Sequence, residues 1–422
     1  MVVTQDPKRR VLKGDVLVED DRIAAVGDVK RKADETIDAT GCMVIPGLIN
    51  AHTHVAMALM RSVADDVYLE QFLDRTFAID AKRTPEDVGI GATLGCLEMA
   101  RSGTTTFLDM YYDEDVIAKS VEQIGIRGYL GWTVLDEEFT TQKGKPLANC
   151  EKFIRSHKGR RLLKPLVSLQ GVYVCSDETL LAGKDLAERE KTFCHFHLSE
   201  TRHEVYEFQR KSGKRPGNHL TEIGFYSKGA VAAHSVWLTI NEVRELAKAG
   251  VSVAHCPTSN MKLASGGVAP VPEMFENGVT VSLGTDSCSS NNSLDMFLEM
   301  KFASLLQKSF RWDASVIPAQ KAFDMATIDG AKALGAENDL GSIEVGKKAD
   351  IVVLDCNTPS MLPLTTENAV ANLVYASPSG AVRDTIVDGR FVLRDRKISN
   401  LDEAAFLEEA QLAAAELMRK AK

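Results

Sequence analysis

Two histidines separated by one residue are the first side chains whose types and spacing could do chemistry. They stand in Asn50-Ala51-His52-Thr53-His54, directly after an apolar run and the Pro46-Gly47 break. In extended backbone, residues i and i+2 point to the same face, so both imidazoles could reach one metal ion at the end of a strand. The same pattern is also typical of two hydrogen-bonded surface histidines, so the metal interpretation depends on what accompanies it.

Further imidazoles and carboxylates stand where later apolar runs of the chain end. In chain order they are His195, His197, Glu200, His234, His255 and Asp286. If these runs are strands of one parallel barrel, their ends meet on the rim where such barrels build active sites. Imidazole and carboxylate groups are ligands of Zn²⁺, and three imidazoles with one carboxylate leave a position for a reactive water.

We expect different roles for the members of this set. His195 shares a face with His197 but lies one pleat deeper, so we expect it to pack against a ligand rather than to bind the ion. His255 is expected to orient the loop that follows it. Glu200 could act as a general acid or base, since partial burial raises the pKa of a carboxyl, or it could be a first-turn acid of the next helix. Asp286 could be a turn residue, although its place at a strand end favours ligation or proton abstraction.

The elements that must position these side chains have the pattern of repeated βα units. Eight short apolar segments alternate with helical stretches, one of which opens with the capping sequence Thr84-Pro85-Glu86. This alternation favours an α/β fold with a (β/α)8 TIM-like barrel over a doubly wound sheet. The predicted strands are Gly47–His52, Thr104–Met110, Gly128–Leu135, Leu166–Tyr173, Phe193–Leu198, Ala230–Val236, Ser252–His255 and Thr280–Gly284.

Both ends of the chain carry short β-type runs of a different kind. The early runs lie within residues 11–46, and a later set begins with Ala349–Asp355 and ends in a hairpin signal around Asp388-Gly389. We therefore predict a small β-sandwich domain built from residues 1–46 and 347–400, around a catalytic barrel of residues 47–346. The Ala/Glu/Leu-rich residues 401–422 predict an amphipathic C-terminal helix.

Composition and charge exclude several classes of function. The 422 residues include 50 Lys+Arg and 59 Asp+Glu, a formal net charge of −9, which disfavours nucleic acid as a partner. No apolar stretch approaches the ~18 residues of a membrane span, and no signal peptide is apparent, so no membrane partner and a cytoplasmic location are expected. The eight cysteines form no CxxC pair and are expected to be reduced and mostly buried.

Other catalytic motifs do not occur in the sequence. There is no GxSxG nucleophile elbow, no Walker A loop and no HExxH helix. The HxE and PCxxC elements of the small zinc deaminases are also missing.

At this point the chain closely resembles the amidohydrolase superfamily. Within it, the sequence looks most like the branch of 5′-methylthioadenosine/S-adenosylhomocysteine and 5′-deoxyadenosine deaminases, beside the s-triazine chlorohydrolases. The resemblance extends over essentially the whole chain. The motifs that carry it are Gly47–His54, Leu59-Met60-Arg61, His197-Leu198-Ser199-Glu200-Thr201, Ala233-His234, His255–Ala264, Ser282–Asp286 with Ser290-Asn291-Asn292, and Gly341–Leu354.

The resemblance implies a metal-dependent deaminase and assigns its residues. His52, His54, His197 and Asp286 would bind one divalent metal, usually zinc, with Fe²⁺ or Mn²⁺ as alternatives. The metal would acidify a water whose hydroxide attacks C6 of an adenine ring. His234 and Asp286 would take or hold the water proton, and Glu200 would protonate the ring nitrogen next to C6. Ammonia would leave and an inosine analogue would form.

Three positions depart from the bacterial members of that branch and bear on the substrate. Asp80 falls where a Glu usually holds the ribose hydroxyls, and a shorter carboxylate could still accept those bonds. Gln170 stands where a His usually contacts the purine, and its amide can donate the same bond. Trp132 replaces an Arg of some relatives, which favours a neutral 5′-substituent over a zwitterionic tail. Glu200 and Asp286 complete the expected substrate contacts.

Two rival functions stay open on the sequence alone. One is an aminohydrolase or chlorohydrolase acting on another N-heterocycle such as guanine, cytosine or an s-triazine. The other is a non-catalytic barrel scaffold, since fold alone does not fix function. The expected partner is a small-molecule nucleoside, and the acidic surface with its C-terminal helix is compatible with a homo-oligomer.

Overall fold

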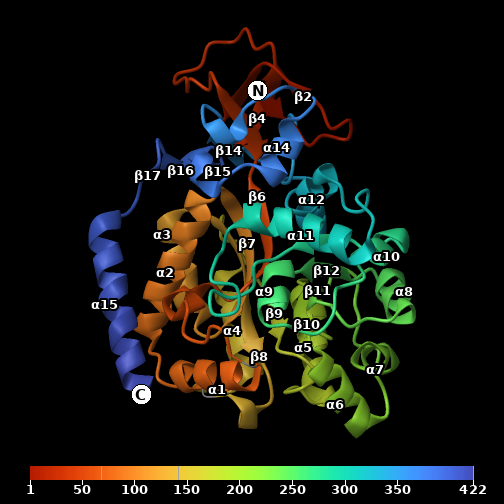
Figure 1. Cartoon of the computed structure of the whole chain (residues 1–422). Helices are drawn as coiled ribbons and strands as arrows, with labels where there is room; N and C mark the ends of the chain where they lie inside the picture. Colours follow the sequence, from red (N-terminus) through yellow and green to blue (C-terminus); the bar gives the residue numbers. More distant parts are fainter. Residues whose placement is uncertain (68, 141, 422) are drawn as a thin grey trace.

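Eight parallel strands form the centre of the molecule in the computed structural model, which describes residues 1–67, 69–140 and 142–421 (Figure 1). The strands neighbour one another in chain order, as expected for successive βα units. They are β6 (Leu48–Thr53), β7 (Thr104–Tyr111), β8 (Arg127–Val134), β9 (Leu163–Leu169), β10 (Cys194–Leu198), β11 (Val231–His234), β12 (Ser252–His255) and β13 (Val281–Leu283).

The first and last strands of this sheet meet and nearly close it into a barrel. Thr53 forms a parallel bridge with Asp286, and the backbone N–H of Asp286 donates to the carbonyl of His52 at 2.9 Å. Gly284 makes this approach possible, because a Cβ there would lie 2.9 Å from the backbone nitrogen of His52 and 2.7 Å from its Cβ. The predicted TIM-like barrel is therefore confirmed.

Substituting Gly284 with alanine is expected to destabilise the protein by about 1–3 kcal/mol, the usual cost of overpacking a filled site. The added methyl group would push on the His52 backbone, so activity should fall as well. Urea unfolding and the rate per folded molecule measure the two effects. Gly380→Ala is the matched control, since nothing lies within 4 Å of a Cβ at that position. Equal effects of the two substitutions would refute this interpretation of the seam.

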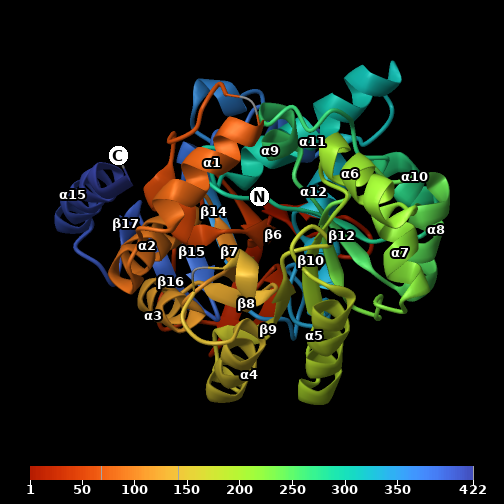
Figure 2. The ribbon, with the colours of Figure 1, turned by 90° about the horizontal axis from the view of Figure 1, so that it is seen from below.

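Helices between the strands form the outer layer of the barrel (Figure 2). The predicted helix start at Thr84 is confirmed: its side chain accepts from the backbone N–H of Asp87, whose carboxylate accepts from that of Thr84. The elements of this layer are η1 (Val55–Met60), α1 (Leu69–Asp80), α2 (Pro85–Arg101), α3 (Glu114–Ile124), η2 (Glu137–Phe139), α4 (Pro146–His157), α5 (Asp177–Glu190), α6 (Arg202–Ser212), α7 (Pro216–Glu222), α8 (Ile240–Ala249), α9 (Pro257–Lys262), α10 (Val271–Glu276), α11 (Met296–Arg311), α12 (Ala319–Met325) and α13 (Ile328–Ala333).

A separate mixed sheet joins the two ends of the chain, above the barrel in Figure 1. Its strand order is β17-β16-β15-β14-β5-β1-β2, and a hairpin of β3 and β4 packs its apolar side chains against it. The boundaries of the composite domain at residues 46 and 347 stay a prediction. The elements are β1 (Val2–Val3), β2 (Val11–Leu12), β3 (Asp15–Glu19), β4 (Arg22–Gly27), β5 (Cys42–Pro46), β14 (Ile351–Asp355), η3 (Pro359–Met361), α14 (Ala369–Tyr375), η4 (Ser379–Ala381), β15 (Val382–Val387), β16 (Arg390–Arg394) and β17 (Lys397–Ile398).

The C-terminal helix α15 (Glu403–Ala421) lies along the outside of the barrel beside α2. Phe406 and Ala410 pack on Leu97 of α2, so the apolar face expected from the sequence is partly buried there. Lys422, the last residue of the predicted helix, lies outside the described residues. Among the described helices, none combines the length and the apolar composition needed to cross a bilayer.

Strand β9 differs from its prediction at both ends. It begins at Leu163 rather than Leu166, and it ends at Leu169 rather than continuing to Tyr173. It begins earlier because Leu163, Lys164 and Pro165 pair with β8, and it ends earlier because Gly171, with a φ of +141°, turns the chain out of the sheet and accepts at its carbonyl from the backbone N–H groups of Val174 and Cys175. Gln170 and Tyr173 therefore belong to a turn on the barrel rim.

Candidate metal centre

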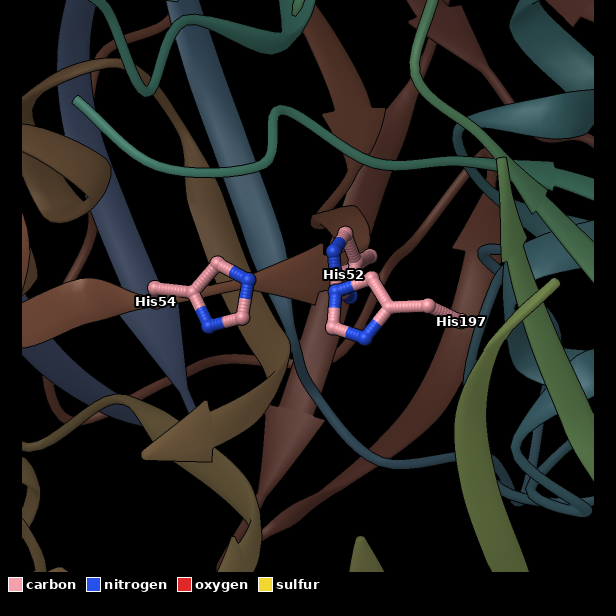
Figure 3. A group of neighbouring side chains, drawn as sticks. All are labelled: His52, His54 and His197. Carbon is pink, nitrogen blue, oxygen red and sulfur yellow. The ribbon is translucent and has the colours of Figure 1, made fainter. Parts of the chain in front are cut away.

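Four histidines and one aspartate converge at the carboxyl-terminal rim of the barrel. His52 is on β6 and His54 follows it, while the others lie at the ends of β10, β11 and β13 as His197, His234 and Asp286. The ring centroid of His52 is 4.9 Å from that of His54, 5.0 Å from that of His197 and 5.1 Å from that of His234. Figure 3 shows the rings of His54 and His197 approaching from opposite sides, with His52 behind them.

The donor atoms of this group fit a bound cation. Two triplets, His52 with His54 and His197, and His52 with His234 and Asp286, each keep one ligand atom per residue within 4.8 Å of the others. His52 is fully buried, and its Nε2 has no hydrogen-bond partner among the described residues. A buried polar atom without a partner is costly, and a metal ion at this point would satisfy it.

Hydrogen bonds on the far side of each ring set the orientation of the imidazoles. His54 Nδ1 donates to the carbonyl of Met110 at 2.6 Å, and His197 Nδ1 donates to that of Gln170 at 2.7 Å. Because Nδ1 carries the proton, the Nε2 lone pair of each ring is free to bind a metal. Burial lowers the pKa of His52 to about 3 and holds that of His197 well below its usual range. Both rings are therefore in the neutral form that ligation requires.

Asp286 divides its two oxygens between the histidines and two serines. Its Oδ1 lies 3.5 Å from His52 Nε2 and 3.4 Å from His54 Nε2. Its Oδ2 accepts from Ser259 Oγ at 2.6 Å and from Ser290 Oγ at 2.8 Å. Burial would raise the pKa of Asp286, but the contact with His52 and the neighbouring His234 and His54 lower it well below its usual range. The residue is therefore an ionised carboxylate.

Glu200 and His234 face each other beside this group. Glu200 Oε2 is 3.7 Å from His234 Nε2, and burial together with the charge of Asp286 raises the pKa of Glu200 to about 8. The Asn260 amide donates to His234 Nδ1 at 3.2 Å. Rotation of the side-chain amide so that its nitrogen and oxygen exchange places would present the oxygen instead. Asn260 can therefore hydrogen-bond to His234 in either tautomer. Glu200 can therefore hold and release a proton near neutral pH.

Strained backbone marks three of these strand ends. The φ angles of Ser199, His234 and Asp286 are 48°, 66° and 62°, in the left-handed region that residues other than glycine seldom adopt. Such conformations cost free energy and persist only where the surroundings enforce them. At Asp286 the enforcing contact is the hydrogen bond from its backbone N–H to the carbonyl of His52.

Asp80 lies near this rim and is held by two donors. Arg83 Nε donates to its Oδ1 at 2.6 Å, and the hydroxyl of Tyr111 donates to the same oxygen at 2.5 Å. Tyr111 follows Met110, whose carbonyl orients His54. Among the described residues, none donates to Oδ2 of Asp80, so this oxygen is left for a ligand or solvent.

Gln170 and Trp132, the two remaining predicted substrate contacts, bind other groups of the protein in this structure. The carbonyl of Gln170 orients His197, while its amide donates to the hydroxyl of Tyr173 at 3.0 Å. Trp132 packs on Phe153 of α4 with ring centroids 6.1 Å apart, and its indole N–H donates to Gln142 at 2.7 Å. Trp132 therefore faces the helix layer. This position does not support the predicted role of its ring as an aromatic wall for a 5′-substituent.

Several residues around the site were missed or left open by the sequence. His195 Nε2 lies 3.0 Å from His52 Nδ1, so it orients a candidate ligand from within the barrel. His255 is 1% exposed, and neither ring nitrogen has a partner among the described residues. Ser259 and Asn260 are in the first turn of α9. Their place just after a strand end was the signal that could have identified them.

Comparison with known proteins places these observations in a family. The model of the amidohydrolase family matches residues 43–392. A 5′-deoxyadenosine deaminase of Methanosarcina mazei is 42% identical over 425 residues, covering 99% of this chain and 97% of the relative. A 5-methylthioadenosine/S-adenosylhomocysteine deaminase of Thermodesulfovibrio yellowstonii is 39% identical, covering 97% and 95%. The structure of a zinc-bound adenosine deaminase from Xanthomonas campestris superposes with a TM-score of 0.95 at 33% identity, covering 99% of this chain and 97% of that one. Sequence, fold and histidine group agree, and the chain belongs to the amidohydrolase family.

Proposed function

We propose that this protein is a zinc-dependent hydrolase that deaminates adenosines modified at the 5′ carbon. The substrate class comprises 5′-deoxyadenosine, 5′-methylthioadenosine and S-adenosylhomocysteine, and the products are the inosine analogues and ammonia. The observation that carries the proposal is the facing pair of Glu200 and His234 beside a group of imidazoles and one carboxylate that can hold a metal. The full-length similarity to deaminases with these substrates supports it.

His52, His54, His197 and Asp286 would hold the metal, as Zn²⁺ or alternatively as Fe²⁺ or Mn²⁺. A bound zinc ion supplies a Lewis acid that lowers the pKa of a water molecule toward 7. The fixed Nδ1–H bonds of His54 and His197 keep both rings aimed at the same point. Ser259 and Ser290 keep the carboxylate of Asp286 in place, so the four groups need little rearrangement to bind the ion.

Glu200, His234 and Asp286 would move the protons of the reaction. With its raised pKa, Glu200 can carry a proton near pH 7 and give it to the ring nitrogen beside C6. His234 and Asp286 would accept the proton that the attacking water loses. That proton then passes to the amino group, which leaves C6 as ammonia, and the new hydroxyl on C6 returns a proton to Glu200, so one water is consumed and one C–N bond is broken.

The free oxygen of Asp80 would bind the ribose hydroxyls, and this contact gives a testable prediction. Asp80→Ala should lower kcat/KM for 5′-deoxyadenosine by about 10- to 100-fold, the effect of losing hydrogen bonds to a charged acceptor. A 2′,3′-dideoxy analogue lacks both hydroxyls, so its kcat/KM should change little. Steady-state kinetics on both substrates makes the comparison. Equal losses would mean that Asp80 only anchors Arg83 and Tyr111.

The experiment that tests the function follows the loss of the adenine ultraviolet band on zinc-loaded protein. Parallel reactions contain 5′-deoxyadenosine, 5′-methylthioadenosine, S-adenosylhomocysteine, adenosine and free adenine, each with a chelator-treated control. Chelator-sensitive turnover of the 5′-modified nucleosides with adenine inert is the expected result. Inactivity on all five with zinc bound would overturn the proposal and favour guanine, cytosine or s-triazines. A homo-oligomeric state and a cytoplasmic location stay predictions.

A further inference from the structure

We propose that Glu204 is a positioning residue that fixes the turn carrying Glu200; this inference rests on the proposed role of Glu200. The Glu204 carboxylate uses both of its oxygens on the backbone of that turn. Oε1 accepts from the N–H of Ser199 at 3.1 Å, and Oε2 accepts from the N–H of Glu200 at 2.8 Å. The carboxylate is therefore hydrogen-bonded to both residues of the turn that follows β10, one of which is Glu200 itself.

The next helix but one shows that this arrangement is not ordinary helix capping. Both α6 and α8 begin with the sequence Thr-x-x-Glu, as Thr201 with Glu204 and Thr239 with Glu242. In α8 the glutamate forms the usual capping box, in which Oε2 accepts from the backbone N–H of its own N-cap Thr239 at 2.8 Å. The two oxygens of Glu204 instead accept from the backbone of the two residues that precede its N-cap.

The electrostatic surroundings of the two glutamates also differ. Glu242 is paired with Arg215 at 2.9 Å, whereas no cationic side chain in the described part of the chain pairs with Glu204. Burial and the charge of Glu200 raise the pKa of Glu204 to about 7. Two neighbouring buried carboxyls are an expensive way to cap one helix. The two hydrogen bonds to the turn offset part of this cost.

The turn needs such support because its backbone is strained. Ser199 has a φ of 48°, and an unrestrained chain would leave this region readily. Its carbonyl accepts from the N–H of Trp237 at 2.9 Å, so the loop after β11 holds one side and Glu204 holds the other. Together they fix the direction in which Glu200 faces His234.

Amide variants of the two glutamates make a matched test. Glu204→Gln must lose one backbone bond, because both oxygens accept one. Glu242→Gln can keep its hydrogen bonds, because only Oε2 accepts them and Oε1 has no partner among the described residues, and it loses only the charge that pairs with Arg215. We expect kcat for 5′-deoxyadenosine to fall about 10-fold in Glu204→Gln and about 100-fold in Glu204→Ala. KM, bound zinc and the folded fraction should stay near wild type, and Glu242→Gln should match wild type in kcat, KM and bound zinc, with a loss of stability only, from the unpaired charge of Arg215.

The outcomes separate this proposal from the proposed function. A graded loss of kcat at constant KM and zinc content supports the positioning role. Loss of folded protein or of zinc in proportion to activity would make Glu204 a structural residue only and overturn it, as would unchanged kcat in Glu204→Ala. Glu200→Gln is assayed alongside: if that variant keeps full activity, the role assigned to Glu200 fails first, independently of Glu204.

Discussion

Asp286→Asn is expected to remove the metal and the deaminase activity together. The substitution replaces an anionic ligand by a neutral amide, which is a poor ligand for zinc. In the wild type, one carboxylate oxygen faces the Nε2 atoms of His52 and His54, and the other accepts from the hydroxyls of Ser259 and Ser290. The asparagine must place its N–H₂ group on one of these two sides. Since the ion provides several kcal/mol of transition-state stabilisation, activity should fall at least about 1000-fold. Elemental analysis and the deaminase assay on one preparation measure both effects.

Ser290→Ala is the graded control for this prediction. It removes one of the two hydroxyls on Oδ2 of Asp286 and leaves the other in place. Metal affinity should weaken by about 10- to 100-fold, the usual effect of losing a partner behind a ligand. Excess zinc should therefore restore much of the activity of Ser290→Ala but not that of Asp286→Asn. Full zinc occupancy with full activity in Asp286→Asn would remove this residue from the ligand set.

Glu200→Gln should abolish most of the activity while leaving the zinc content unchanged. Glutamine has nearly the same shape but cannot supply a proton, so the expected loss in kcat is about 100- to 10,000-fold. Glu200 stands 3.7 Å from His234 rather than among the triplets that can hold the ion. Retained zinc with lost turnover would distinguish proton transfer from ligation. Lost zinc would instead make Glu200 part of the metal site.

The pH dependence of kcat gives a second test of the role of Glu200. Burial and the charge of Asp286 raise the pKa of Glu200 to about 8. A metal ion bound nearby would lower this pKa toward 7, because a cation favours the ionised carboxylate. An acid donates its proton only below its pKa, so wild-type kcat should be highest below that value and decline as the pH rises through it. Residual kcat in Glu200→Gln should lack this alkaline decline. A decline at the same pH in both proteins would assign it to another group.

The barrel and the rim positions could be predicted because they depend on local patterns. Apolar runs of strand length alternate with helices, and a parallel barrel brings every strand end to one rim. The presence of His52, His197 and Asp286 on that rim follows from their places at or just after the carboxyl ends of β6, β10 and β13. The hairpin at Asp388-Gly389 could also be predicted, because Asp-Gly is a residue pair that tolerates the left-handed φ values this two-residue turn requires. The observed φ values of the two residues are 48° and 71°.

The contacts behind these residues could not be predicted, because they join segments far apart in the chain. Asn260 reaches His234 from the first turn of another helix. Asp80 meets Tyr111 only because the end of α1 lies against the end of β7. Gln170 acts through its carbonyl, which every residue possesses, so its identity carried no signal. Even the end of β9 was decided by the φ of one glycine rather than by the apolar run.

The join between the two sheets has a consequence for the order in which the chain can assemble during synthesis. Strand β5 runs into β6 with only Gly47 between them, and the N–H of Gly47 donates to the carbonyl of Asp350 at 2.9 Å. The antiparallel neighbour of β5 is β14, which the ribosome makes only after the entire barrel. Until then one edge of β5 is open, immediately before the strand that carries His52 in the chain, and open strand edges promote misassembly. The sheet that joins the two ends of the chain can therefore be completed only after the whole barrel has been synthesised.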